Sequence, residues 1–432
     1  MNQLAEELNT ILKGTAAGRL LSGMGNRIYF PKGIIAQSAE AKKSASNANA
    51  TIGMAYNKGK PLILSAVSEI MPALSAEQIV AYAPTAGLEQ ARKNWQDHIL
   101  EKNPGIKRES ISLPAVIPGL TAGLSCSADL FLDKGQVLIS SDPCWDNYSL
   151  IFEERRESVL RGVPFLGDGP GLDLEAIGKA IREEAKKGQV RILLNFPNNP
   201  SGYSPAHSEA KALADLLLEA AENGADVLVL CDDAYYGLFY EDGLFPESMF
   251  SLLSDLHERI LAVKIDGPIK EDYVWGLRIG FITFGSKGLS PEHCNALVTK
   301  LMGAIRSTVS CANTPAQHII SKVLEDKRTN GEIAIHKEMM QRRYNSVKKI
   351  IFEYQDHPVL KVLPFNSGYF MSFICRSVSA EELRKELLLN HGIGVISLGE
   401  KCLRVAYSSL DEEKIPSVYK TIFECAEKIA KQ

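Results

Sequence analysis

Two cationic residues, Lys270 and Arg278, bracket one loop between apolar runs at residues 260–265 and 279–284. Short apolar runs of this kind are typical of buried strands. A lysine held at a strand end can form a Schiff base with an aldehyde, and an arginine can bind a phosphate through two N–H groups. Together they suit pyridoxal phosphate, which needs an amine for its aldehyde and a cation for its phosphate.

Polar groups also follow the apolar runs at residues 227–231 and 190–194. After the first run, a buried Asp232 can keep a pyridine nitrogen protonated, and the Tyr235 hydroxyl can donate to the phenolic oxygen of the ring. After the second run, the turn NNPSG places Asn199 where it can bind the same oxygen. The alternatives are solvated aspartates at a strand end and a turn without further function.

Three further strand ends carry groups that could bind the cofactor or its substrate. After residues 113–117, the sequence Gly119-Leu120-Thr121 opens a helix, and helix N-termini bind phosphate. After residues 137–140, Trp145 can stack on a flat ring, although a core tryptophan is an equal interpretation. Arg404 lies in an apolar run and needs an anionic partner, either a substrate carboxylate or a structural salt bridge.

These runs alternate with helical segments, such as residues 121–131 and 205–223, the second with Ser204 as its expected N-cap. Alternation of strands and helices predicts an α/β fold: a mainly parallel, doubly wound sheet with helices on both faces. We expect residues 61–325 to form this large domain and residues 326–432 a smaller α+β domain. Residues 1–60, with short helical pieces, are expected to belong to the small domain.

Composition limits the other possibilities. The 432 residues are 45% hydrophobic, and 48 basic against 52 acidic residues give a net charge of −4, so neither nucleic acid nor membrane is an expected partner. The eight cysteines form no CxxC pair and the histidines no ligand spacing, so no metal is expected. An N-terminus without an apolar block, together with scattered thiols, predicts a cytoplasmic protein.

Taken together, these residues resemble the class I aminotransferases of the pyridoxal-phosphate enzymes, particularly the aspartate and aromatic enzymes. The resemblance extends from about residue 82 to residue 404. Its most specific parts are NNPSG at 198–202, DDAY at 232–235, and Lys270 followed by GLRIG at 276–280, in the order and at about the spacing of the family. The agreement of the whole set is far more specific than any one motif.

The resemblance implies a role for each matching position. Lys270 corresponds to the Schiff-base lysine and proton carrier, and Asp232 to the partner of the pyridine nitrogen. The remaining matches are Asn199 and Tyr235 at the phenolic oxygen, Trp145 on the ring, Gly119, Leu120, Thr121 and Arg278 at the phosphate, and Arg404 at the substrate α-carboxylate. Asn199 and Trp145 are also expected to contact the substrate.

Two segments imply a homodimer with shared active sites. Tyr82, in YAPTAGL, resembles the family tyrosine that reaches the phosphate of the neighbouring subunit. Arg306, in IRSTVS, resembles the arginine that binds the distal carboxylate of a dicarboxylic substrate in the neighbouring subunit. The implied partners are therefore a second copy of the chain and small amino and 2-oxo acids.

The segment before Lys270 departs from the family, which usually has serines one and three residues before the lysine. Here those positions are Ile269 and Gly267, preceded by Asp266. A carboxylate beside a phosphate is unfavourable unless it points away. Phosphate binding is then expected to depend more on three other groups: Thr121, Tyr82 and Arg278.

The resemblance implies transamination between an L-amino acid and a 2-oxo acid such as 2-oxoglutarate, by a ping-pong mechanism. Aspartate or glutamate is the expected donor, and aromatic amino acids are the second choice. One alternative is a lyase or synthase reaction with the same cofactor on the same fold. Another is a non-catalytic protein that binds pyridoxal phosphate. A nicotinamide enzyme is disfavoured because no GxGxxG motif follows a strand.

Overall fold

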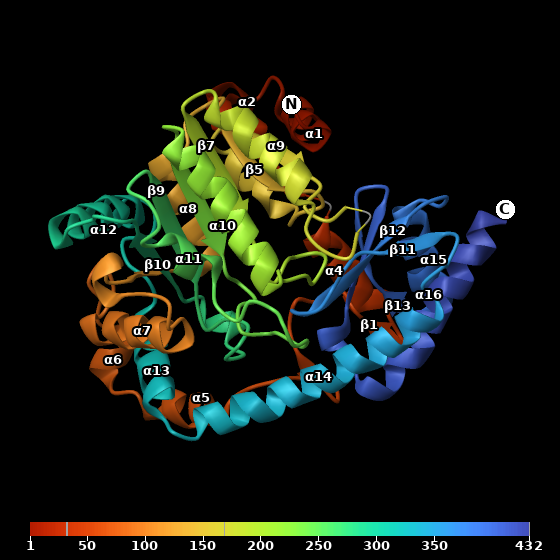
Figure 1. Ribbon diagram of the computed structural model, residues 1–432. Helices are drawn as coiled ribbons and strands as arrows, with labels where there is room; N and C mark the ends of the chain where they lie inside the picture. Colours follow the sequence, from red (N-terminus) through yellow and green to blue (C-terminus); the bar gives the residue numbers. More distant parts are fainter. Residues whose placement is uncertain (32, 168, 432) are drawn as a thin grey trace.

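The computed structural model describes residues 1–31, 33–167 and 169–431. It has two main bodies, one around a seven-stranded sheet and one around a four-stranded sheet, joined along one side by the long helix α14 (Thr329–Glu353) (Figure 1). No helix in these described ranges is both long enough and apolar enough to cross a bilayer.

The large sheet has the strand order β4-β10-β9-β8-β7-β5-β6. Its strands are β4 (Ala115–Ile117), β5 (Val137–Ser141), β6 (Val159–Val163), β7 (Gln189–Leu194), β8 (Asp226–Asp232), β9 (Ile260–Asp266) and β10 (Gly280–Gly285). All neighbouring pairs from β9 to β6 are parallel, and β10 is antiparallel to both β4 and β9. The predicted mainly parallel α/β fold is confirmed, and six of these strands overlap the predicted runs.

Helices cover both faces of this sheet. One face carries α8 (Leu120–Phe131) and α12 (Pro291–Arg306), and the other carries α9 (Leu174–Ala185), α10 (His207–Glu222) and α11 (Met249–Leu253). Along β9 the side chains alternate between two cores: Ile260 and Ala262 belong to the α10 side, and Val263 and Ile265 to the α8 side. The strands therefore read as apolar runs because both of their faces are buried.

Further helices flank the large sheet beside β10. They are α5 (Ser65–Ile70), α6 (Ala76–Val80), α7 (Glu89–Lys102) and α13 (Thr314–Glu325). In α7 the buried residues Ala91, Trp95 and Ile99 recur every four positions, so one face of the helix points into the protein. Trp95 stacks on Phe281 of β10, with ring centroids 4.5 Å apart. Helix α7 is thereby fixed against β10, the strand next to the edge strand β4.

The second body is an antiparallel sheet of order β11-β12-β15-β14 covered by helices. Its elements are β11 (Leu360–Val362), β12 (Phe370–Cys375), α15 (Ala380–His391), β13 (Ile393–Gly394), β14 (Ile396–Leu398), β15 (Cys402–Ala406) and α16 (Ile415–Ala430). Helix α14 packs against α16, so it contributes to this body as well. The predicted domain limits at residues 60 and 325 remain a prediction.

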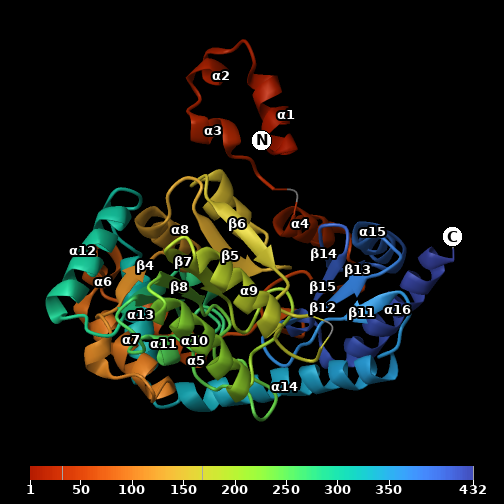
Figure 2. The same ribbon diagram turned by 45° about the horizontal axis from the view of Figure 1, so that its top comes forward.

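The N-terminal residues contact both bodies. The elements of this N-terminal segment are α1 (Gln3–Leu12), α2 (Ala16–Leu20), α3 (Gly23–Arg27), α4 (Ile34–Ser44), β1 (Ala48–Asn49), β2 (Tyr56–Asn57) and β3 (Lys60–Pro61). Helix α4 packs on β13 and β14, and β1 pairs with β13. Helices α1–α3 project from the main bodies (Figure 2), and Arg27 ties them to the large sheet through an ion pair with Glu157 at 3.1 Å.

One local prediction was wrong, and one strand was not predicted. Ser204 is not the N-cap of α10, which begins at His207: Ser204 is fully buried and its backbone N–H donates to Asn366. Glu209, at the third helical position, instead accepts a hydrogen bond from the backbone of Ala206. Strand β6 was not predicted, because its sequence VLRGV contains an arginine and a glycine at the edge of the sheet.

Candidate active site

A cavity of about 310 Å³ lies at the carboxyl ends of the parallel strands, where such folds bind ligands. The four-stranded sheet closes it with Phe370 of β12 and Arg404 of β15. Nine predicted site residues line it: Leu120, Thr121, Trp145, Asn199, Asp232, Tyr235, Lys270, Arg278 and Arg404. The structure thus brings together residues that are spread over almost three hundred positions of the chain.

Asp232 ends β8 and is 3% exposed. The Tyr148 hydroxyl donates to its Oδ2 at 2.6 Å, and Asn195 donates to its backbone carbonyl at 2.8 Å. Burial raises the pKa of Asp232 to about 6, while the hydrogen bond from Tyr148 acts in the opposite direction. The other oxygen, Oδ1, is buried and has no hydrogen-bond partner within the described chain. Because Asp232 lines the cavity, this unfilled acceptor could take an N–H group of a ligand.

Lys270 lies in the loop after β9, with its Nζ 2.8 Å from the carbonyl oxygen of Gly53. The same Nζ lies 4.9 Å from the centroid of the Tyr235 ring. Burial, together with the positive charges of Arg404 and Arg278, lowers the pKa of Lys270 to about 7. A substantial share of the amine is therefore neutral, and nucleophilic, near neutral pH.

Arg404 is 2% exposed, and its guanidinium faces the cavity from β15. It donates to Asn199 Oδ1 and to the carbonyl of Thr51, each at 3.0 Å, and lies 4.3 Å from the centroid of the Phe370 ring. Burial lowers the pKa of Arg404. Neutral groups hold this cation in place, and its Nε is a buried donor without a partner among the described residues. Such a site is suited to a carboxylate.

At the opposite end of the cavity, Arg278 lies against the N-terminus of α8. Gly119, the N-cap, has a φ of +90°, and a Cβ there would lie 2.6 Å from the guanidinium of Arg278. Glycine is therefore required both for the backbone conformation and for the close approach of Arg278. The helix N-terminus at Leu120 and Thr121, together with this cation, could hold a phosphate.

The cavity also contains residues that the motifs did not reveal. Tyr148 packs edge-on against Trp145 at 5.4 Å, and Ile34 and Ile35 enter from the start of α4. The other unpredicted residues are Gly53, Leu124, Asn195, Ala234, Ile269 and Phe370. The three-residue spacing of Trp145 and Tyr148, which places both on one side of a helical turn, was the one available signal.

Tyr82 and Arg306 lie elsewhere on the surface. Tyr82 is 91% exposed, and Arg306, the last residue of α12, hydrogen-bonds to the Ser310 hydroxyl. Their predicted contacts are with a neighbouring subunit, and these contacts stay a prediction.

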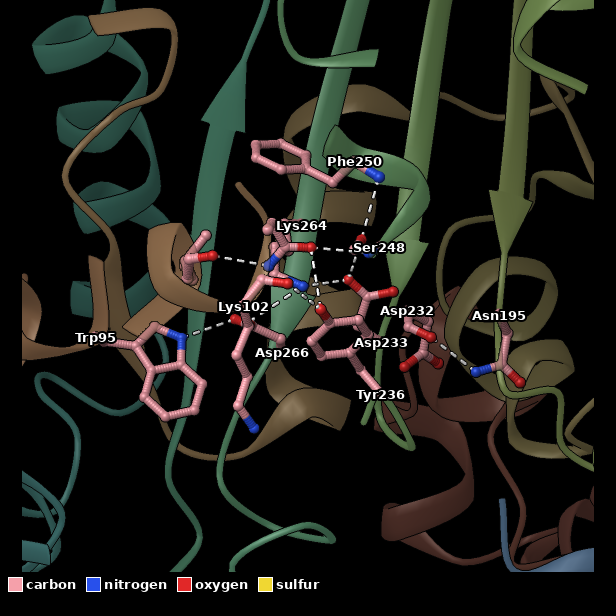
Figure 3. A network of polar contacts seen from close by, with 12 residues as sticks. Trp95, Lys102, Asn195, Asp232, Asp233, Tyr236, Ser248, Phe250, Lys264 and Asp266 are labelled. Atoms are coloured by element: carbon pink, nitrogen blue, oxygen red, sulfur yellow. Dashed lines mark hydrogen bonds and ion pairs between the residues drawn. The ribbon is translucent and has the colours of Figure 1, made fainter. Parts of the chain in front are cut away.

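Asp266 points away from the phosphate end of the cavity. Its carboxylate accepts a hydrogen bond from Trp95 Nε1 at 3.0 Å and lies 3.3 Å from Lys264 Nζ, on the α7 side of the sheet (Figure 3). A Cβ at Gly267 would lie 2.9 Å from the Cα of Gly280, so this position has no room for a serine. The unusual residues before Lys270 therefore place no negative charge beside the phosphate site.

The residues present fit pyridoxal phosphate on two independent observations. The partnerless Oδ1 of Asp232 can accept the N–H of a protonated pyridine, and the helix N-terminus beside Arg278 can hold a phosphate. Lys270, with its lowered pKa, supplies the amine for the aldehyde. The fold and the site together define a pyridoxal-phosphate-dependent transferase.

Comparison with known proteins narrows this class. The family model described as "Aminotransferase class I and II" matches residues 52–422, and the chain belongs to this family. It is 24% identical to an aspartate aminotransferase of Pyrococcus horikoshii, over 78% of this chain and 81% of the relative. It is 23% identical to a probable N-acetyl-LL-diaminopimelate aminotransferase of Bacillus subtilis, over 63% of this chain and 62% of the relative.

Solved structures agree. An aminotransferase from Anaerococcus prevotii superimposes with a TM-score of 0.82, at 25% identity, over 93% of this chain and 98% of that one. A kynurenine aminotransferase from Pyrococcus horikoshii, solved in complex with PMP, shares the fold with a TM-score of 0.77, at 16% identity, over 96% of this chain and 98% of that one. The protein is an aminotransferase, and pyridoxal 5′-phosphate is its cofactor.

Proposed function

We propose that the protein transfers an amino group between aspartate or glutamate and a 2-oxo acid such as 2-oxoglutarate. The observation that carries this proposal is Arg404, a buried cation held by neutral groups in the same cavity as Lys270. Donor and acceptor both have a carboxylate next to the reacting carbon, so one arginine can bind each in turn. This use of one site for two substrates implies ping-pong kinetics.

Pyridoxal phosphate, when bound, supplies the electron sink for reaction at the α-carbon. We assign Lys270 the transfer of the α-proton, because its lowered pKa suits a general base near neutral pH. Asp232 would hold the pyridine nitrogen protonated through its free Oδ1. The other proposed contacts are Asn199 and Tyr235 at the phenolic oxygen, Trp145 on the ring, and Gly119, Leu120, Thr121 and Arg278 at the phosphate.

We further infer a homodimer in the cytoplasm, in which Tyr82 and Arg306 complete the site of the partner subunit. The large exposure of the Tyr82 ring supports this, because aromatic side chains are enriched in protein interfaces. In this arrangement Arg306 would bind the distal carboxylate of aspartate or glutamate, and Tyr82 the phosphate.

Aromatic or aliphatic amino acids are a second candidate for the donor, which a specific observation favours. The cavity walls contributed by α4 and its surroundings are apolar: Ile34 and Ile35 face it together with Trp145 and Phe370. These side chains would bury an apolar substrate side chain favourably, at about 25 cal/mol per Å². The charge of Arg306 and the apolar walls therefore predict different donors.

The test measures kcat/KM for aspartate and for phenylalanine in the wild-type protein and in Arg306→Leu. If the proposal is correct, the variant loses about 10²-fold for aspartate and little for phenylalanine, because a buried carboxylate is left unpaired. Equal values for aspartate in both proteins would refute the dicarboxylate proposal. Pyruvate and ammonia formed from an amino acid without any 2-oxo acid would instead indicate a lyase.

A further inference from the structure

Helix α7 contacts the chain on both sides of Lys270. Before Lys270, Trp95 Nε1 donates to Asp266 Oδ1 at 3.0 Å, and after it, Lys102 Nζ forms an ion pair with Glu271 at 2.5 Å. Trp95 and Lys102 are seven residues apart, which is about two turns, so they lie on the same face of the helix. One rigid element thus holds the chain four residues before Lys270 and one residue after it.

The contact at Asp266 is part of a larger buried cluster. Lys264, which is fully buried, forms ion pairs with Asp266 and with Asp233, and Asp233 also accepts a hydrogen bond from Ser248 at 2.6 Å (Figure 3). Asp233 directly follows Asp232, the proposed partner of the pyridine nitrogen. The cluster therefore joins the ends of β8 and β9, the two strands that deliver Asp232 and Lys270 to the cavity.

The cluster lies on the face of the sheet opposite to the cofactor. Lys264 and Asp266 alternate with Ile265, whose side chain belongs to the core under α8. Gly267 fits closely against β10 and leaves no room for a side chain between this cluster and the phosphate site. Charged groups on the face of the sheet opposite to the cofactor thus hold the segment that leads to Lys270. The segment itself has no serine hydroxyls, because Gly267 and Ile269 stand at the positions where the family usually has serines.

Stability alone does not account for such a cluster. Moving charges out of water costs several kcal/mol for each ion, and buried ion pairs often stabilise a protein no better than apolar residues of similar volume. Buried charge networks do fix a single geometry, because each member is costly to leave without its partner. The geometry fixed here is that of the loop 267–270, whose far end is also held by the Tyr369 hydroxyl on the carbonyl of Lys270 at 2.7 Å.

We propose that Trp95 and Lys102 are positioning residues: through Asp266 and Glu271 they set the place of Lys270 Nζ relative to the cofactor aldehyde. The inference rests on the proposed role of Lys270. It does not depend on which amino acid is the donor.

The test compares Trp95→Phe and Lys102→Met with Lys93→Met, which removes an exposed ion pair from the same helix. Phenylalanine keeps a ring against Phe281 and removes the N–H donor to Asp266. We measure three quantities: the dissociation constant of pyridoxal phosphate, the pH midpoint of the visible absorption of the loaded protein, and the melting temperature. Trp95→Phe and Lys102→Met are expected to weaken cofactor binding about fivefold and to shift the pH midpoint, and Lys93→Met to change neither.

A second pair of variants separates positioning from folding. Asp266→Asn keeps an oxygen that accepts from Trp95, and Asp266→Ala does not, so the asparagine variant should retain the tighter cofactor binding of the two. Melting temperatures that fall while the dissociation constant and pH midpoint stay at wild-type values would overturn the proposal. Because the readout is cofactor binding, an error in the proposed donor would not affect the result.

Discussion

Two aspartates that are neighbours in the sequence, Asp232 and Asp233, have opposite environments. Asp232 faces the cavity, and one of its carboxylate oxygens is buried without a partner in the described structure. Asp233 faces the other side of the sheet, where it binds both Lys264 and the Ser248 hydroxyl. The strand thus separates a carboxylate with an open hydrogen-bonding position from one whose partners are all present.

This difference recurs among the cations. Among the described residues, Lys270 and Arg404 contact neutral groups, namely carbonyl or amide oxygens and aromatic rings. Lys264, in contrast, is paired with two carboxylates. Buried charges are costly unless compensated, so a cavity that collects uncompensated ones is built to receive compensating charges from a ligand. The opposite cluster is complete without a ligand. Charged groups without a charged partner, more than charge or burial alone, distinguish the cavity from the cluster around Lys264.

The comparison is tested most severely by removing Lys270. Lys270→Ala should lower transamination by about 10³-fold or more, because both the amine and the proton carrier are lost. The variant should still bind pyridoxal phosphate through the phosphate site and Asp232. The measurements are steady-state rates and the dissociation constant of the cofactor. A variant that retained a tenth of the wild-type rate would show that another group carries the proton.

Removing the paired lysine should have a different outcome. Lys264→Met leaves the carboxylates of Asp233 and Asp266 buried without a cation, and the free energy of unfolding should fall by roughly 3–5 kcal/mol. Arg404→Met removes a cation from the open site and should change the unfolding free energy much less, while raising KM for both substrates. Urea denaturation of the cofactor-free proteins measures this difference. Equal losses in the two variants would contradict the distinction between open and closed sites.

Much of this arrangement follows from the sequence. Apolar runs of four to six residues located six strands of the large sheet. The groups after them, such as Asp232 and Lys270, meet because parallel strands end at one edge. The two-residue period of a strand also predicts that the side chains of Asp266 and Lys264 point to the same face of the sheet. The sequence could not show which of the two faces this is, because helices bury both faces of the strand.

Other features depend on tertiary contacts that no local pattern encodes. Gly53, Ile34 and Ile35 reach the cavity from the N-terminal segment, and a glycine carbonyl carries no sequence signal for binding a lysine. Ser204 has the residue type of an N-cap, but its burial against Asn366 shifts the start of α10 to His207. In each case a partner distant in the sequence decides the outcome.

The pKa of Lys270 provides the third prediction. Burial and the charges of Arg404 and Arg278 lower it from 10.5 to about 7, so the amine loses its proton as the pH rises through about 7. The rate at which pyridoxal phosphate attaches to the cofactor-free protein should rise with the same midpoint, as measured by stopped-flow absorbance. Arg404→Met should move the midpoint upwards, since a positive neighbour is removed. A wild-type midpoint near pH 10 would contradict the proposed environment.

The smallest predicted effect concerns Tyr148. Its hydrogen bond opposes the rise in the pKa of Asp232, so Tyr148→Phe should raise that pKa above about 6, by about one unit. Asp232 must be ionised to pair with a protonated pyridine, and affinity is lost as the pH falls through its pKa. The low-pH limit of cofactor affinity should therefore move to higher pH, with up to about a tenfold loss near pH 6 and little change at pH 8.

This shift is best measured in the Lys270→Ala background, where the amine no longer contributes to the pH dependence. Tyr419→Phe is the matched control, because Tyr419 is equally buried and its hydroxyl has no partner among the described residues. If the pH limit were the same with and without the Tyr148 hydroxyl, Asp232 would not control cofactor binding through its charge. The open oxygen of Asp232 would then have to act as a neutral acceptor, and the contrast with Asp233 would be one of partners alone.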